Sequence, residues 1–113
     1  MDIKVNRKVK CIETLVSEIT EKDFPLESVI MFGSFATGTF HERSDLDLCL
    51  VHDDDKEPTY GEKVEIESYF DKIVGAEMAV DYIYVPVMKM KTGNQVFNSI
   101  RESGLVLWEH SGK

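Results

Sequence analysis

The chain has 113 residues and a formal net charge of −8 at pH 7, with 42% hydrophobic and 30% charged residues. This composition excludes a disordered protein, and the length predicts one domain over residues 1–113. The acidic balance argues against direct binding of duplex nucleic acid and suits a protein that handles anions through metal ions or docks on a basic partner, although solubility alone would also explain it.

The first predicted element is an amphipathic helix over residues 3–20. Its apolar residues recur in steps of three and four, at Val5, Val9, Ile12, Val16 and Ile19. Asp2 is the expected N-cap. Pro25 ends the helical region, because proline lacks an N–H and disfavours helix in the residue before it.

Two short apolar segments then predict strands that lie side by side. The first is SVIMF, residues 28–32, closed by Gly33, and the second is the alternating DLDLCLV, residues 45–51. Between them, SFATG allows at most one or two turns of helix, and residues 39–44 form a polar loop.

The second half of the chain predicts a loop, two more helices and a third strand. These are a loop over residues 52–61, a helix over 62–73, a strand over 77–85, a helix over 94–104 and the short apolar segment LVLW. Pro86 ends the strand, and Met88 and Met90 are expected to pack in the core or against a partner. The order predicts an α/β (α+β) fold, a mixed β-sheet with helices packed on it.

Nothing in the sequence predicts a membrane or an oxidising compartment. Residues 1–10 have no apolar run after their charges, and no segment offers the roughly 18 apolar residues that span a bilayer. Cys11 and Cys49 are expected to be reduced packing residues. We therefore expect a cytoplasmic protein that does not contact a membrane.

Two aspartates in the second strand are the first candidate for chemistry. Asp45 and Asp47 point to the same side of the strand, with Cα atoms about 7 Å apart at a rise of roughly 3.3 Å per residue. Carboxylates at this spacing can converge on divalent cations, as in two-metal phosphoryl-transfer sites, and the cations would offset their mutual repulsion. The same DxD pattern also occurs in exposed loops, strand edges and helix caps, and this interpretation stays open.

Gly33 and Ser34 are a candidate phosphate-binding site close to these aspartates. A strand that turns into a helix at glycine lets the backbone approach a ligand, and the N–H groups of the helix start can bind an anion. Asp81, in the middle of the third strand, is the candidate third carboxylate, able to hold a metal and to take a proton. Tyr84 is a further candidate to line the site. A simple turn at Gly33-Ser34 and an edge-strand charge at Asp81 are the alternatives.

The segment GSFATGTFHERSDLDLCLV, residues 33–51, resembles the signature of the DNA polymerase β-like nucleotidyltransferase superfamily. The short chain and the segment NQVFNSIRESGLVLWE resemble its minimal nucleotidyltransferase (MNT) group, and the similarity extends over most of residues 5–109. The resemblance implies that Gly33 and Ser34 bind the triphosphate. It also implies that Asp45, Asp47 and Asp81 form the catalytic and metal-binding triad, with two Mg²⁺ ions, for which Mn²⁺ can substitute.

The implied reaction transfers a nucleoside monophosphate, AMP from ATP or another nucleoside triphosphate, to a hydroxyl group and releases pyrophosphate. Many relatives carry a basic side chain near the position of Phe35 or Thr37, and this sequence departs from them because both residues are uncharged. Arg43 is a candidate to replace that charge from the following loop. The alternative is that Arg43 is a solvated loop residue without such a role.

Stand-alone MNT proteins are commonly encoded beside a helical HEPN-type ribonuclease, and some act as antitoxins that adenylylate this toxin. The resemblance therefore implies a HEPN partner with a tyrosine acceptor, all the more because the helical acceptor domain of larger relatives has no counterpart after Trp108. Two alternatives are a binding module that neutralises its partner by contact, and a small-molecule (antibiotic-type) nucleotidyltransferase completed by a second chain or a homodimer. Residues 105–108 either face a partner or form a closing edge strand.

Overall fold

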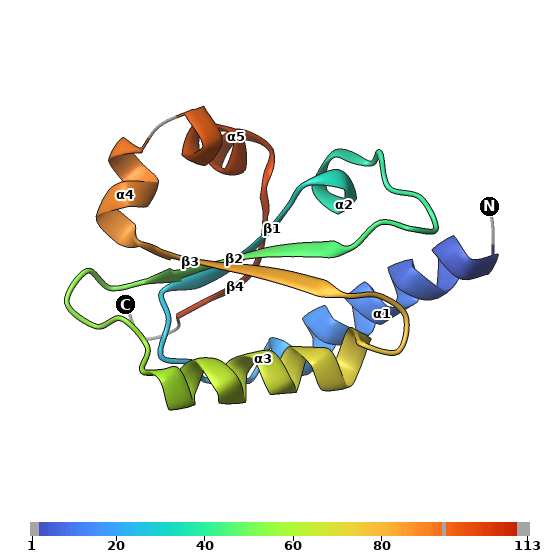
Figure 1. Cartoon of the computed structure of the whole chain (residues 1–113), viewed down its shortest axis with the longest axis horizontal. Helices are drawn as coiled ribbons and strands as arrows, with labels where there is room; N and C mark the ends of the chain where they lie inside the picture. The colour runs from blue at the N-terminus through green and yellow to red at the C-terminus, as the bar shows by residue number, and fades with distance from the viewer. Residues whose placement is uncertain (1–2, 94, 111–113) are drawn as a thin grey trace.

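The structure is a computed structural model that describes residues 3–93 and 95–110, and a four-stranded mixed sheet lies at its centre (Figure 1). The strands are β1 (Ser28–Phe32), β2 (Leu46–His52), β3 (Val80–Pro86) and β4 (Leu105–Glu109), in the order β3-β2-β1-β4. Strand β1 runs antiparallel to both β2 and β4, whereas β2 and β3 are parallel. The predicted fold class, a mixed sheet with helices, is confirmed.

Helices cover both faces of this sheet. In the described part of the chain they are α1 (Ile3–Ile19), α2 (Ser34–Thr37), α3 (Tyr60–Val74), α4 (Val87–Thr92) and α5 (Gln95–Ser103). Figure 1 shows α1 and α3 together on one face, and α4 and α5 on the other. The short α2 follows directly on β1.

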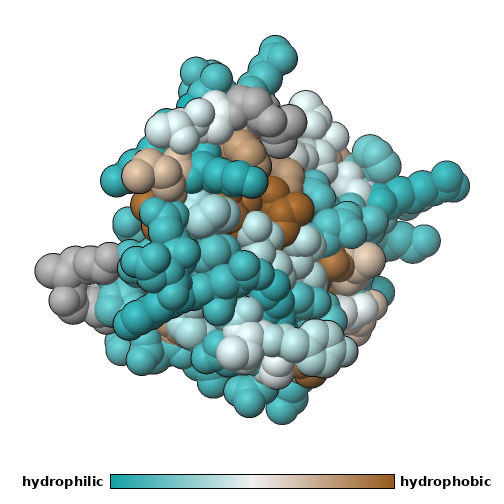
Figure 2. Space-filling model, turned by 60° about the vertical axis from the view of Figure 1, so that its left-hand side comes forward, coloured by the Kyte–Doolittle hydropathy of each residue, from teal (hydrophilic) through white to brown (hydrophobic). Residues whose placement is uncertain are grey.

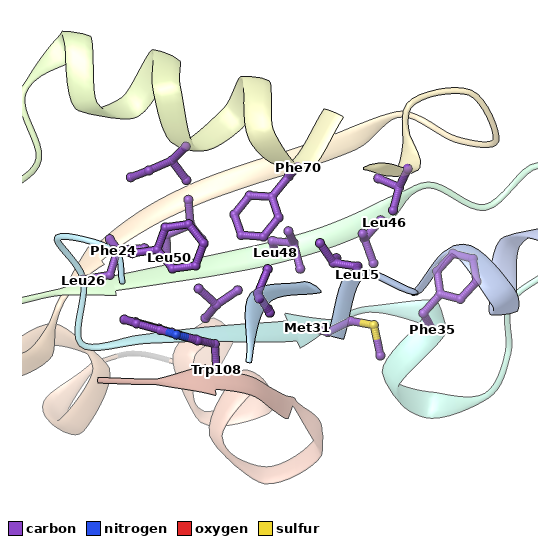
Figure 3. Close-up of a cluster of buried hydrophobic side chains, with 14 of the residues drawn as sticks. Leu15, Phe24, Leu26, Met31, Phe35, Leu46, Leu48, Leu50, Phe70 and Trp108 are labelled. Atoms are coloured by element: carbon purple, nitrogen blue, oxygen red, sulfur yellow. The ribbon is translucent and has the colours of Figure 1, made fainter. Parts of the chain in front are cut away.

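Strand β2 carries buried apolar residues on both of its faces, as suits a strand that helices cover on both sides. Leu46, Leu48 and Leu50 belong to the larger core, on the side of α1 and α3 (Figure 3). Cys49 and Val51 point the other way, into a second core that includes residues of α4 and α5. The predicted alternation is confirmed, and it places Asp47 on the same face as Cys49.

Helix α1 buries a different stripe from the one the apolar spacing predicts. Its buried residues are Lys8, Leu15 and Ile19, whereas Val5, Val9, Ile12 and Val16 are half-buried beside them. The face that meets the sheet thus runs along positions 8, 12, 15 and 19, and it includes a lysine. The predicted cap, Asp2, lies outside the described residues.

Helix α3 begins and ends close to its predicted limits because local signals define both ends. Thr59 and Glu62 form a capping box, in which each side chain accepts a hydrogen bond from the other residue's backbone N–H. After Gly75, the N–H groups of Glu77 and Met78 still donate to the carbonyl of Val74. This turn is why β3 starts at Val80 and not at the predicted residue 77.

Helix α4 has no counterpart among the predicted elements. It starts directly after Pro86, and its Met88 N–H donates to the Asp54 carboxylate at 3.0 Å. Met90 is buried in the second core, whereas Met88 is exposed. The prediction that both methionines pack therefore holds for Met90 and not for Met88 within this chain.

The segment LVLW forms part of the edge strand β4. Trp108 is buried, and its indole N–H donates to the Lys22 carbonyl at 2.8 Å, so this residue closes the core. Leu105 and Val106 are exposed. Helix α5 lies at its predicted position but ends at Ser103, one residue before the predicted limit, and residue 94 lies outside the described residues.

Both cysteines are free, as predicted. Complete burial of Cys49 raises the pKa of its thiol to about 11, so the thiol stays protonated at neutral pH. Figure 2 shows a face on which hydrophilic side chains predominate around small hydrophobic patches. Among residues 3–93 and 95–110, no helix has the length and apolar character needed to cross a membrane.

Candidate active site

The predicted site residues meet at one end of the sheet, where β1 ends and where β2 and β3 begin. Asp47 in β2 lies directly between Phe32 in β1 and Asp81 in β3 in the strand register. Paired residues on neighbouring strands project to the same face, so the carboxyl groups of Asp47 and Asp81 lie side by side. Asp45 stands just before β2, and Gly33 just after β1.

Gly33 lies against the carboxylate of Asp47. Its backbone has φ 75° and ψ −152°, a combination that residues with a Cβ rarely adopt. A Cβ atom at this position would lie 2.2 Å from Asp47 Oδ2 and 3.2 Å from its Cγ. Glycine is therefore required here for two reasons: the backbone conformation disfavours a Cβ atom, and the Asp47 carboxylate leaves no room for one.

Ser34 begins the single turn of α2. The Gly33 carbonyl accepts from the N–H groups of Ala36 and Thr37, and the Ser34 carbonyl accepts from Gly38. The first N–H groups of a helix have no partner within it, so those of Ser34 and the next residue are open to a ligand near Asp47. Ser34 itself is half-buried beside this position.

Phe35 and Thr37, the two positions without a basic side chain, make contacts within the turn and the loop that follows it. Phe35 is buried and stacks on Phe40, with ring centroids 4.7 Å apart. The Thr37 hydroxyl lies 3.3 Å from the Gly33 carbonyl and 3.0 Å from the Thr39 hydroxyl. Arg43 is exposed in the following loop, where its backbone N–H donates to His41 Nδ1, and the proposed use of its side chain stays a prediction.

Burial and the two neighbouring carboxylates act on Asp47. The pKa of Asp47 is raised, first by its burial, then by the charges of Asp81 and Asp45, and further by a hydrogen bond between the carboxyl groups of Asp47 and Asp81. A raised pKa means that the charged form is disfavoured when the site holds no cation. A bound cation would relieve this cost.

The donor set fits a hard divalent cation, although the three carboxylates are not already arranged around one position. Carboxylate oxygens are the ligands that Mg²⁺ and Mn²⁺ prefer. Across residues 3–93 and 95–110, no three His, Cys, Asp or Glu side chains are already gathered to coordinate an ion. Asp47 and Asp81 are paired across β2 and β3, and the exposed Asp45 would have to turn toward them.

Tyr84 does not line this site, and the expectation that it does is wrong. Residues three apart on a strand point to opposite faces, so Tyr84 projects away from Asp81. Its hydroxyl donates to Glu67 Oε2 on α3 at 2.7 Å. Tyr82 lies on the same side and donates to Asp71 on α3 at 2.9 Å.

The carboxylates of the site are accessible from solvent. Four surface cavities of about 340–570 Å³ are lined by other residues, and none of them includes Gly33, Ser34 or the three aspartates. Asp45 and Asp81 are exposed, and Asp47 is half-buried. A long, charged ligand can therefore reach the carboxylates without an opening movement.

Comparison with known proteins decides the family. The profile of the nucleotidyltransferase domain matches residues 13–104. The chain belongs to the nucleotidyltransferase domain family. The predicted enzyme class is thereby confirmed, and the matched region contains all five residues proposed for the site.

Individual relatives of this nucleotidyltransferase agree with that assignment. It is 29% identical to a Methanocaldococcus jannaschii protein assigned as a protein adenylyltransferase, over 67% of this chain and 76% of the relative. It is similar to a chain of a toxin–antitoxin structure with AMP-PNP, at 19% identity and a TM-score of 0.55, over 90% of this chain and 73% of that chain. A Sulfolobus solfataricus protein assigned as a nucleotidyltransferase matches at 22% identity and a TM-score of 0.50, over 94% and 84% of the two chains. At these identities, the solved structures show that the fold is shared.

Proposed function

We propose that this nucleotidyltransferase moves AMP from ATP to a hydroxyl group, with divalent cations held by Asp45, Asp47 and Asp81. The observation that carries the proposal is the strand register that puts Asp47 beside Asp81, with Gly33 against the Asp47 carboxylate. This arrangement joins a carboxylate pair to a stretch of backbone that a ligand can approach closely. Phosphoryl transfer with metal ions needs both.

The metal ions would bind to the three carboxylates, with Asp47 in the middle of the set. When bound, Mg²⁺ or Mn²⁺ neutralises charge on the α-phosphate and on the leaving pyrophosphate. The chain supplies the positions of the carboxylates: two of them are fixed by the β2–β3 ladder, and Asp45 stands one residue outside it.

Gly33 and Ser34 would hold the triphosphate. The glycine leaves room for phosphate oxygens beside Asp47, and the Ser34 hydroxyl and the first N–H groups of α2 can donate to them. Because neither Phe35 nor Thr37 carries a charge, backbone and hydroxyl donors take a larger share of phosphate binding here than in relatives with a basic side chain.

In the transfer step, the acceptor oxygen forms a bond to the α-phosphorus while the bond from that phosphorus to the bridging oxygen of pyrophosphate breaks. The proton of the acceptor hydroxyl goes to a carboxylate, and we assign this role to Asp81. Asp81 is exposed at the edge of the sheet, since β3 is the outermost strand, so an incoming acceptor can reach it.

The acceptor we propose is a tyrosine hydroxyl of a HEPN-type toxin, which would make this chain its antitoxin. Three observations support this setting: the resemblance to MNT proteins, the relative assigned as a protein adenylyltransferase, and the shared fold with a chain of a toxin–antitoxin structure. The net charge of −8 also suits a basic, RNA-binding partner.

The test uses the chain together with a HEPN-type protein from the same genome, Mg²⁺ and ATP labelled at either the α- or the γ-phosphate. AMP transfer labels the HEPN protein from α-labelled ATP only, with a mass gain of one AMP unit on tyrosine. Asp45→Asn and Asp81→Asn should abolish the label. Asp23→Asn, which removes an exposed aspartate from the loop before β1, is the matched control and should retain it.

The remaining outcomes separate the alternatives. If the mutants neutralise the HEPN protein as well as the wild type does, without any label, the chain acts as a binding module. If pyrophosphate is released only when a small hydroxylated molecule is supplied, the acceptor is that class of molecule. Either result overturns the protein-acceptor proposal.

A further inference from the structure

Lys8 is a charged residue in the buried stripe of α1. Only 5% of its surface is exposed, and it shares the sheet-facing side of the helix with Leu15 and Ile19. Removing an ammonium group from water is costly unless it gains strong partners. An apolar side chain of similar length would fill this position without that cost, so the ammonium group itself needs an explanation.

The ammonium group of Lys8 is bonded to the peptide that leads into Asp45. Its Nζ donates to the carbonyl oxygen of Ser44 at 2.7 Å, across 36 residues of sequence. That carbonyl and the N–H of Asp45 belong to one peptide unit. Because a peptide unit is planar, holding its oxygen also fixes the direction in which the Asp45 backbone starts.

Asp45 needs this support more than the other two aspartates do. Asp47 and Asp81 are paired with each other in the β2–β3 ladder, whereas Asp45 precedes the first residue of β2 and is exposed. The other polar groups of Ser44 are also bonded: its N–H donates to the His41 carbonyl at 3.0 Å, and its hydroxyl oxygen accepts from the His41 N–H at 2.8 Å. With the bond from Lys8 to the Ser44 carbonyl, the N–H, the hydroxyl and the carbonyl of Ser44 are all hydrogen-bonded.

We infer that Lys8 is a positioning residue that sets the place of the Asp45 carboxylate for a divalent cation. The inference rests on the proposed function, which makes Asp45 a metal ligand. Lys8 comes from α1, which covers the sheet face opposite to Asp47, so it acts through the Ser44–Asp45 peptide and does not touch the bound groups. Groups that orient a ligand in this way typically change metal affinity about 10- to 100-fold when they are removed.

The test measures the affinity of the full chain for Mn²⁺ by electron paramagnetic resonance, without ATP. Lys8→Met keeps the apolar stem and removes the donor, and it should weaken Mn²⁺ binding by about tenfold. Lys10→Met, at an exposed position of the same helix, is the matched control and should bind Mn²⁺ as the wild type does. Urea unfolding in EDTA checks that each variant is folded. If Lys8→Met is not folded, Lys8→Leu, which also removes the donor, takes its place, with the same expected loss.

A second background distinguishes positioning from general stability. In the Asp45→Asn protein, Lys8→Met should cause no further loss of Mn²⁺ affinity, because the effect acts through the Asp45 carboxylate. An equal loss in both backgrounds, or unchanged affinity of a folded Lys8 variant in the wild-type background, overturns the inference. A wild-type chain that binds no Mn²⁺ overturns instead the proposed function on which the inference depends.

Discussion

Replacing Gly33 with alanine should separate the geometry of the site from the stability of the fold. The φ of 75° and ψ of −152° lie in a region that is essentially reserved for glycine, so alanine should cost about 1–3 kcal/mol of unfolding free energy through backbone strain alone. The added Cβ would also lie 2.2 Å from Asp47 Oδ2, whereas ordinary contacts begin at 3.4 Å. The carboxylate therefore has to move by about an ångström, a shift that can lower a transfer rate about a hundredfold.

Gly38→Ala is the matched control, because Gly38 has a φ of 81° and open space where a Cβ would lie. It should cost about 1–2 kcal/mol through its left-handed conformation, without moving a carboxylate. Urea unfolding gives the stability of both variants, and Mn²⁺ affinity and the rate of AMP transfer report on the site. Equal affinities and rates in folded Gly33→Ala and Gly38→Ala would refute the reasoning. In an Asp47→Ala background, Gly33→Ala should cost less stability than in the wild type, because the clashing oxygen is gone.

Two further predictions follow from the electrostatics and from the strand faces. Because burial, Asp81 and Asp45 raise the pKa of Asp47 above 3.8, the folded metal-free protein holds this proton more tightly than the unfolded chain does. Its unfolding free energy in EDTA, measured by urea titration, should therefore fall as the pH rises from 3.8 through the raised pKa. The Asp47→Asn protein should lack this fall. Parallel curves of unfolding free energy against pH for the two proteins would contradict the prediction. Tyr84→Phe should leave AMP transfer unchanged and lower the unfolding free energy by about 1 kcal/mol, because the hydrogen bond to Glu67 is lost. Slower transfer at unchanged stability would instead show that Tyr84 acts in the site.

Local patterns were sufficient to predict the strands that carry the site. The apolar run before Gly33 gives β1 its observed limits, and the leucines that alternate with Asp47 give β2 its face toward α1 and α3. A strand period of two depends only on neighbouring residues, so the sequence contains it in full. The same rule, applied correctly, places Tyr84 away from Asp81.

Contacts between distant segments were not predictable from such patterns. Helix α4 is a single short stretch whose first turn is bonded by Asp54, more than thirty residues earlier in the chain. Lys8 lies at a position where the period of α1 continues to Leu15, but only the folded chain shows that its ammonium group meets the Ser44 carbonyl. The register that sets Asp47 against Asp81 likewise depends on how β2 and β3 pair.

The position of the second core explains how buried strands can present charged groups. Helices α4 and α5 cover the sheet over Cys49, Val51 and Val85, whereas on the same face Asp47 is half-buried and Asp81 is exposed. Cys49 is fully buried two residues after the half-buried Asp47, so the packed part of β2 holds the strand rigid while the face that carries Asp47 remains partly open to solvent. Rigid support from one end and access from the other are what a site for a long, charged ligand requires. The carboxylates repel one another most when no cation is bound, and packing of the strands holds them together in that state.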